Sequence, residues 1–327
     1  TQVQLRTYMN TSLPSPTTQP GLLGYYTFDD LLNKQGNTVY NVTLNGGATI
    51  NNTNPSCAFF ADSCLTTTAI GNIVNDYTPV LALNPCDNKL TVEDGTKYNI
   101  GDTVLLIQMK GAVIDTTNTV TFGTIIDYKN AGNYEFNYIK TKVGNIIELQ
   151  NILSRSYDIP NGKVQLIRVP YFQNPDINTT LTCKAWDGST GGVLVLNAAD
   201  TVILDANIDV SGKGFRGAIG FDNNLPTTSN CFENNYNYPL GSVLSGHKGE
   251  SITNVSNNLI GGKGSPASAG GAGLDHNSGG GGGGNGGIGG YGGYQLDNCL
   301  NAPFDNRGIG GKKLDYNTTT NKIFMGG

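Results

Sequence analysis

The side chains that could do chemistry in this chain are few, and their spacing argues against catalysis. The sequence of 327 residues has two histidines, His247 and His276, and both lie in glycine-rich stretches. It contains no zinc-protease motif, no nucleophile elbow and no phosphate-binding loop. Residues 212–217 fit the string GxGxxG, but no helix-forming segment follows to supply the N-terminus that binds phosphate. We therefore expect a protein that is not an enzyme.

Two pairs of aspartates are the candidate metal ligands. Asp29 and Asp30 are adjacent, whereas Asp205 and Asp209 flank an expected corner between strands. Calcium takes about six to eight oxygen ligands, which carboxylates and the carbonyl groups of Asn-rich loops can supply. Aspartate is also a common turn residue, and no calcium-loop spacing is present. We expect no cofactor, with calcium at these pairs as the alternative.

The candidate ligand-binding residues are aromatic. Trp186 precedes a run of apolar strands, where it either plugs a core or presents its ring to a sugar. Tyr291 and Tyr294 stand three residues apart in a glycine-rich tract, and Ile288 lies three residues before them. A helix with three residues per turn would place these side chains on one face. Exposed aromatic rings can stack on sugar rings, so a glycan is an expected ligand.

Six cysteines without a CxxC or zinc-type spacing favour an exported protein. A local bridge between Cys57 and Cys64 and pairing of these two residues elsewhere both stay open. The candidates for disulfide bonds are Cys57, Cys64, Cys86, Cys183, Cys231 and Cys299.

Composition excludes several classes of protein. The 20 basic residues do not offset the 25 acidic ones, and the net charge is -5, so nucleic-acid binding is not expected. No run approaches the ~18 apolar residues of a membrane-spanning helix. The 46 glycines exclude a helical bundle. The chain opens as a mature product would and stops within a glycine pattern, so we expect it to continue in a longer protein.

The elements that position these residues are expected to be β-strands. Apolar alternation and turn signals are typical of an antiparallel sandwich or barrel. The predicted strands cover residues 102–109, 119–126, 134–139, 145–149 and 164–169.

Two further regions follow the barrel or sandwich. Residues 191–212 hold three apolar strands with very short connections, which indicates one or two coils of a β-solenoid, with an antiparallel meander as the alternative. Residues 261–294 contain 18 glycines in 34 positions. They form either a flexible linker or, as we favour, a polyglycine-type lobe of extended segments bonded backbone to backbone. The expected fold class is all-β, with three parts: 1–85, an N-terminal arm and small β module; 86–182, a β-sandwich or barrel; and 183–327, β-solenoid-like strands plus the glycine-rich lobe.

Three segments resemble a known group of surface proteins. They are DTVLLIQMKGA at residues 102–112, AGNYEF at 131–136 and IDVSGKGFRG at 208–217, followed by the glycine-rich tract. In this order they resemble the large type IX-secreted surface proteins of gliding Bacteroidetes, the SprB-like gliding adhesins. The glycine-rich lobe also resembles polyglycine regions of some receptor ectodomains and phage fibre tips. The resemblance implies export, display on the outer cell surface and adhesion, and it brings no catalytic residues.

The expected function is therefore that of a non-enzymatic module of a secreted cell-surface adhesin or filament, in gliding or attachment. The alternative is a carbohydrate-binding module of a secreted polysaccharide-processing protein. The expected partners are a surface glycan or polysaccharide, the type IX secretion and motility machinery, and a second copy of the chain or other surface proteins.

Overall fold

The chain divides into two compact units, Thr1–Thr67 and Thr68–Gly327. In the first unit, the computed structural model has two short 3-10 helices, η1 (Pro16–Thr18) and η2 (Thr38–Tyr40). Asn37 caps η2, because its side-chain oxygen accepts a hydrogen bond from the backbone N–H of Val39. The structure describes residues 15–18, 20, 22, 25, 33–41, 67–220, 234–274, 277–295, 305–315 and 321–326.

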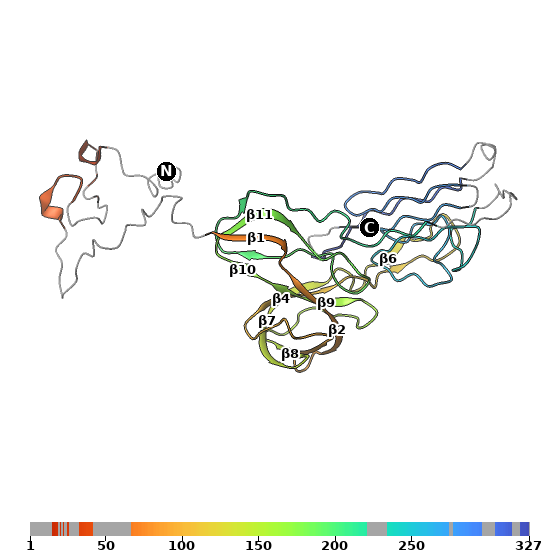
Figure 1. Ribbon diagram of the computed structural model, residues 1–327, viewed down its shortest axis with the longest axis horizontal. Helices are drawn as coiled ribbons and strands as arrows, with labels where there is room; N and C mark the ends of the chain where they lie inside the picture. Colours follow the sequence, from red (N-terminus) through yellow and green to blue (C-terminus); the bar gives the residue numbers. More distant parts are fainter. Residues whose placement is uncertain are drawn as a thin grey trace. The chain divides into compact units, whose positions relative to one another are not determined.

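The second unit is built on β-strands (Figure 1). Six strands close into a barrel in the order β2-β3-β8-β7-β4-β9, and every neighbouring pair is antiparallel. Strands β1, β11 and β13 form a parallel sheet, β10 and β12 a parallel pair, and β5 and β6 an antiparallel pair. This confirms the all-β prediction. The strands are β1 (Thr68–Ile73), β2 (Asp76–Asn84), β3 (Lys89–Val92), β4 (Thr103–Gln108), β5 (Val113–Ile114), β6 (Ile125–Asp127), β7 (Tyr134–Val143), β8 (Ile146–Leu149), β9 (Val164–Val169), β10 (Tyr171–Phe172), β11 (Pro175–Thr182), β12 (Asn197–Ala198) and β13 (Ile203–Leu204).

Alternation along the strands separates the barrel interior from its outer face. On β4, Val104 and Leu106 lie in the interior cluster, whereas Leu105 and Ile107 belong to a second cluster outside the barrel. Both faces of β4 are thus buried, which explains its continuous apolar sequence. The expected boundary at residue 85 lies between β2 and β3, the first two strands of the barrel.

One predicted strand was wrong. Of residues 119–126, only the last two belong to a strand, β6. The preceding residues form a loop around Asp115, whose carboxylate accepts hydrogen bonds from the Thr117 backbone N–H at 2.8 Å and the Thr121 hydroxyl at 2.6 Å. Threonine favours β-strands by propensity, but the threonines here form the hydrogen bonds of a turn instead.

Parallel pairing identifies a coil beside the barrel. Ile177 of β11 pairs with Leu204, and Leu181 pairs with Ile208, 27 residues further along the chain. The barrel, from Asp76 to Val169, is inserted between β1 and β10, so the first coil is interrupted by a whole subdomain. The parallel direction agrees with the predicted solenoid and not with an antiparallel meander.

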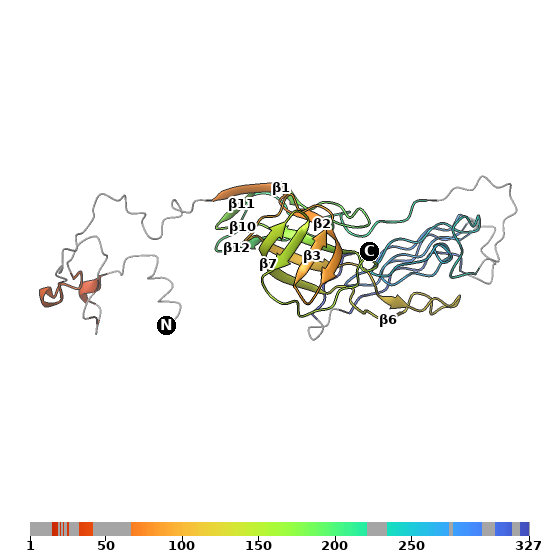
Figure 2. The same cartoon turned by 90° about the horizontal axis from the view of Figure 1, so that it is seen from below.

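The glycine-rich lobe is ordered in its described part and uses hydrogen bonds three residues apart. Gly308, Gly311 and Leu314 donate to the carbonyls of Gly279, Gly282 and Asn285 at 2.9, 2.8 and 2.7 Å. Gly289 and Gly292 donate back to Gly311 and Gly308. A repeat of three residues per turn is that of a polyproline-type extended helix. Figure 2 shows these teal and blue segments running side by side, and their hydrogen bonds join backbone to backbone as in the predicted polyglycine-type lobe.

Close approach of the backbones explains which positions require glycine. A Cβ at Gly292 would overlap the carbonyl oxygen of Gly279, and one at Gly310 would overlap that of Gly289. A Cβ at Gly290 or Gly293 would have nothing within 4 Å. The glycines therefore fall into a packed set and an open set.

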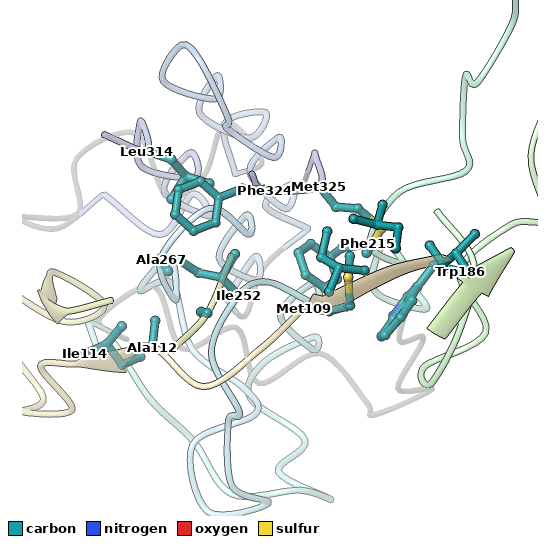
Figure 3. Close-up of a cluster of buried hydrophobic side chains, with 14 of the residues drawn as sticks. Met109, Ala112, Ile114, Trp186, Phe215, Ile252, Ala267, Leu314, Phe324 and Met325 are labelled. Carbon is teal, nitrogen blue, oxygen red and sulfur yellow. The ribbon is translucent and has the colours of Figure 1, made fainter. Parts of the chain in front are cut away.

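A shared apolar cluster joins the barrel, the coil and the lobe (Figure 3). Trp186 packs edge-to-face on Phe215, with ring centroids 5.8 Å apart. Met109, which follows β4, lies beside them in Figure 3, and Met325 comes from the end of the chain. The second unit thus has a continuous outer core besides the barrel interior, and a third, smaller cluster around Ile70, Ile177 and Leu181 lies within the coil.

Candidate functional site

The exposed aromatic residues of the glycine-rich lobe form the candidate site. Tyr291 is 60% and Tyr294 68% exposed, and Ile288 is 78% exposed. The intervening glycines, Gly289 and Gly292, turn their N–H groups towards the segment 308–311. The three-residue repeat therefore leaves the larger side chains on the surface while glycine faces the neighbouring backbone.

Arg307, from the neighbouring segment, lies against both rings. Its guanidinium carbon is 3.8 Å from the ring centroid of Tyr294 and 5.1 Å from that of Tyr291, within cation–π range. The carboxylate of Asp305 holds the guanidinium through Nε and Nη2, at 2.9 and 2.7 Å. Hydrogen bonds from Arg307 lower the pKa of Asp305, so this pair stays ionised at neutral pH. We call these four residues the tyrosine–arginine site.

Trp186 is not a sugar platform. Its side chain is 3% exposed and packs against Phe215, so neither face of the indole is open to a ligand. The interpretation as a core plug at the start of the coil is the one that the structure supports. The sugar-binding alternative for this residue fails because the apolar cluster covers the ring.

The predicted carboxylate pairs have different outcomes. Asp205 and Asp209 are exposed on the last turn of the coil. Asp209 accepts a hydrogen bond from the backbone N–H of Ser211 at 2.8 Å, which lowers its pKa and is typical of a turn residue. In the part of the chain that the structure describes, no three acidic, cysteine or histidine side chains gather as a metal site. Asp29 and Asp30 lie outside the described residues.

The disulfide prediction fails for two of the six cysteines. Cys86 is an exposed free thiol and Cys183 a buried one, and burial raises the pKa of Cys183. Cys183 is completely buried and serves as a small apolar residue. The other four candidates, Cys57, Cys64, Cys231 and Cys299, lie outside the described residues.

A charged cluster that the sequence did not reveal lies where the barrel meets the lobe. Glu250 binds Lys110 at 3.1 Å through Oε1, and Arg216 at 2.7 Å through Oε2. Burial by itself would raise the pKa of Glu250, but the hydrogen bond from Arg216 and the charge of Lys110 lower it to about 2. The three residues come from distant parts of the chain, so no local pattern predicts the cluster.

Two shallow cavities, of about 380 and 260 Å³, lie along the lobe beside residues 215–220. Ala218, His247 and Gly280 belong to both, and the larger cavity is also lined by Ile219, Val243 and Leu244. Arg216 and Glu250 line the smaller cavity, where they already bind each other. The smaller cavity is thus lined mostly by glycine and alanine, whereas the larger one has apolar side chains as well.

No known protein family and no curated protein matches this chain. A solved structure that is similar is the Gp54 tailspike of Acinetobacter baumannii bacteriophage AP22, in complex with A. baumannii capsular saccharide. The two share 13% sequence identity and a TM-score of 0.22, over 33% of this chain and 17% of the tailspike chain. The chain thus matches less than a fifth of the tailspike, and a similarity this low carries no argument about function.

Among the described residues, none of the helices has the length and apolar character needed to cross a membrane.

Proposed function

We propose that this chain is a non-enzymatic adhesive module of a secreted cell-surface protein, and that its tyrosine–arginine site binds a surface glycan. The observation that supports this is the fixed backbone beneath the site. Gly289 and Gly292 are bonded to a neighbouring segment on one side, while Tyr291 and Tyr294 remain exposed on the other. Rings that are held in place before binding lose little entropy when a ligand docks.

The chemistry of the site favours a sugar over an anionic polymer. The Tyr291 and Tyr294 rings offer apolar faces to the C–H groups of a pyranose, while Asp305 and Arg307 can bond to its hydroxyls. Asp305 neutralises Arg307, so the site has little net charge to attract a polyanion.

The placement on a gliding or attachment adhesin, exported by type IX secretion, rests on the resemblance of residues 102–112 and 208–217 to SprB-like adhesins. Under this proposal the secretion and motility machinery is a second partner of the parent protein.

The test is a glycan array followed by titration of any glycan that binds the full chain. The double variant Tyr291→Ala/Tyr294→Ala should bind at least about tenfold more weakly, as expected when two central aromatic contacts are lost. Tyr171→Ala is the matched control, because Tyr171 is also 60% exposed but lies on the coil. A chain that binds no glycan, or a double variant that binds as tightly as the wild type, would contradict the proposal.

A further inference from the structure

The interior of the coil ends in an uncovered apolar ladder. Ile70 of β1 pairs with Ile177 of β11, and Ile177 pairs in turn with Leu204 of β13. Ile70 and Ile177 are 7% and 0% exposed, whereas Leu204, the last member, is 62% exposed. Side chains in register along a sheet stack on one face. Leu204 therefore has an apolar neighbour on one side and none from the described chain on the other.

A second ladder ends in the same way. Leu181 of β11 is fully buried, but its partner Ile208 is 52% exposed. Val202 and Val210, which flank these positions, are 42% and 47% exposed. The last turn of the coil thus presents four aliphatic side chains where a further turn would cover them.

The backbone at this end is open as well. The N–H groups of Asp205 and Asp209 donate to the carbonyls of Ile177 and Leu181 in β11. Because backbone groups alternate along a strand, those of Ala206 and Ile208 face the opposite edge. Among the described residues, β13 pairs with β11 and with no other strand. An unpaired edge of this kind is a template for another strand.

The chain itself contains a strand that fits. At the other side of the same sheet, β1 also pairs only with β11 within the described part of the chain. All three strands are parallel, so β1 of a second copy can follow β13 without a change of direction. Such a contact uses two different surfaces and repeats head to tail.

We propose that copies of this chain associate head to tail, with β1 of one copy added to β13 of the next. Leu204 and Ile208 then lie beneath the incoming strand, and the apolar ladders continue through the junction. This contact is separate from the tyrosine–arginine site, which lies on the glycine-rich lobe.

Sedimentation velocity of the full chain over rising concentrations tests this. The wild type should form dimers and longer chains, and Leu204→Asp should weaken association at least about tenfold, because a charge replaces a buried apolar contact. Ile152→Asp is the matched control: Ile152 is 81% exposed but lies outside the coil, and its variant should associate like the wild type.

A mixing experiment tests the two-sided nature of the contact. Ala69→Pro should block the β1 edge, because the N–H of Thr68 donates to the carbonyl of Asn174, just before β11, and the N–H of Ala69 faces away from β11. Each variant alone should be monomeric, whereas an equimolar mixture with Leu204→Asp should form dimers and no longer chains. Circular dichroism and unchanged glycan binding verify that both variants fold. A wild type that stays monomeric, association that survives Leu204→Asp, or a mixture without dimers would overturn the proposal.

Discussion

Three charged residues, of which Lys110 is buried, connect the barrel to the glycine-rich lobe. Glu250 is the centre of this arrangement, since it binds Lys110, which is 7% exposed, and Arg216. Lys110 also lies 5.5 Å from the ring centroid of Phe215. A buried ammonium group without its carboxylate would be costly, so the buried Lys110 needs the half-buried Glu250 as its partner.

The stability of the chain should therefore depend on Glu250 in acid. The pKa of Glu250 is about 2 in the folded chain against 4.5 ordinarily, so the stabilisation is complete above pH 4.5 and is lost as the pH falls to 2. Glu250→Gln should lower the free energy of unfolding by about 2 kcal/mol at pH 7. Denaturant titrations at pH 7 and pH 2 should show a difference between the two proteins only at pH 7. An equal difference at both values would contradict this.

At the scale of elements, the glycine segments are held by backbone contacts that side chains would block. Gly292→Ala should destabilise the lobe by ~1–3 kcal/mol, because its Cβ would overlap the carbonyl oxygen of Gly279. Gly290→Ala is the control, since its Cβ would meet nothing within 4 Å. Hydrogen exchange over residues 279–293 should rise in the first variant and stay unchanged in the second. Equal exchange in both variants would argue against close backbone packing.

Sequence patterns predicted some of these elements and missed others for physical reasons. Apolar alternation was sufficient for β7, and mainly apolar runs were sufficient for β4 and β9, which are buried on both faces. The sequence patterns missed β2, because proline usually interrupts a strand, although Pro79 pairs here with Gln165. Barrel closure between β2 and β9 joins residues that are far apart in sequence, which no local pattern contains.

The candidate site was predictable in part. The three-residue spacing predicted that Tyr291 and Tyr294 share one face, and in the structure both rings contact Arg307 and are exposed. Arg307 was not predicted, because it reaches the rings from another segment through backbone pairing of the lobe. Trp186 was ambiguous for a similar reason: its burial depends on Phe215 and on the outer face of the barrel.

At the scale of the whole second unit, stability should depend on the outer apolar cluster. Trp186→Ala should lower the free energy of unfolding by ~3–5 kcal/mol, as is usual for a buried aromatic side chain. Tyr138→Ala, at a position 51% exposed on β7, should have a much smaller effect. Thermal unfolding followed by circular dichroism compares the two. A loss for Trp186→Ala no larger than that for Tyr138→Ala would show that the cluster does not hold the unit together.

The insertion of the barrel between β1 and β10 has a consequence for synthesis on the ribosome. β1 leaves the ribosome before the barrel, but its partner β11 is made only after the barrel is complete. The two ends of the barrel, Asp76 and Arg168, are paired neighbours joined by a salt bridge of 2.6 Å. The barrel can therefore close before β1 has a partner strand. Its closure brings the growing chain that follows β9 back beside β1. The coil, which is synthesised last, then assembles on a barrel that has already folded.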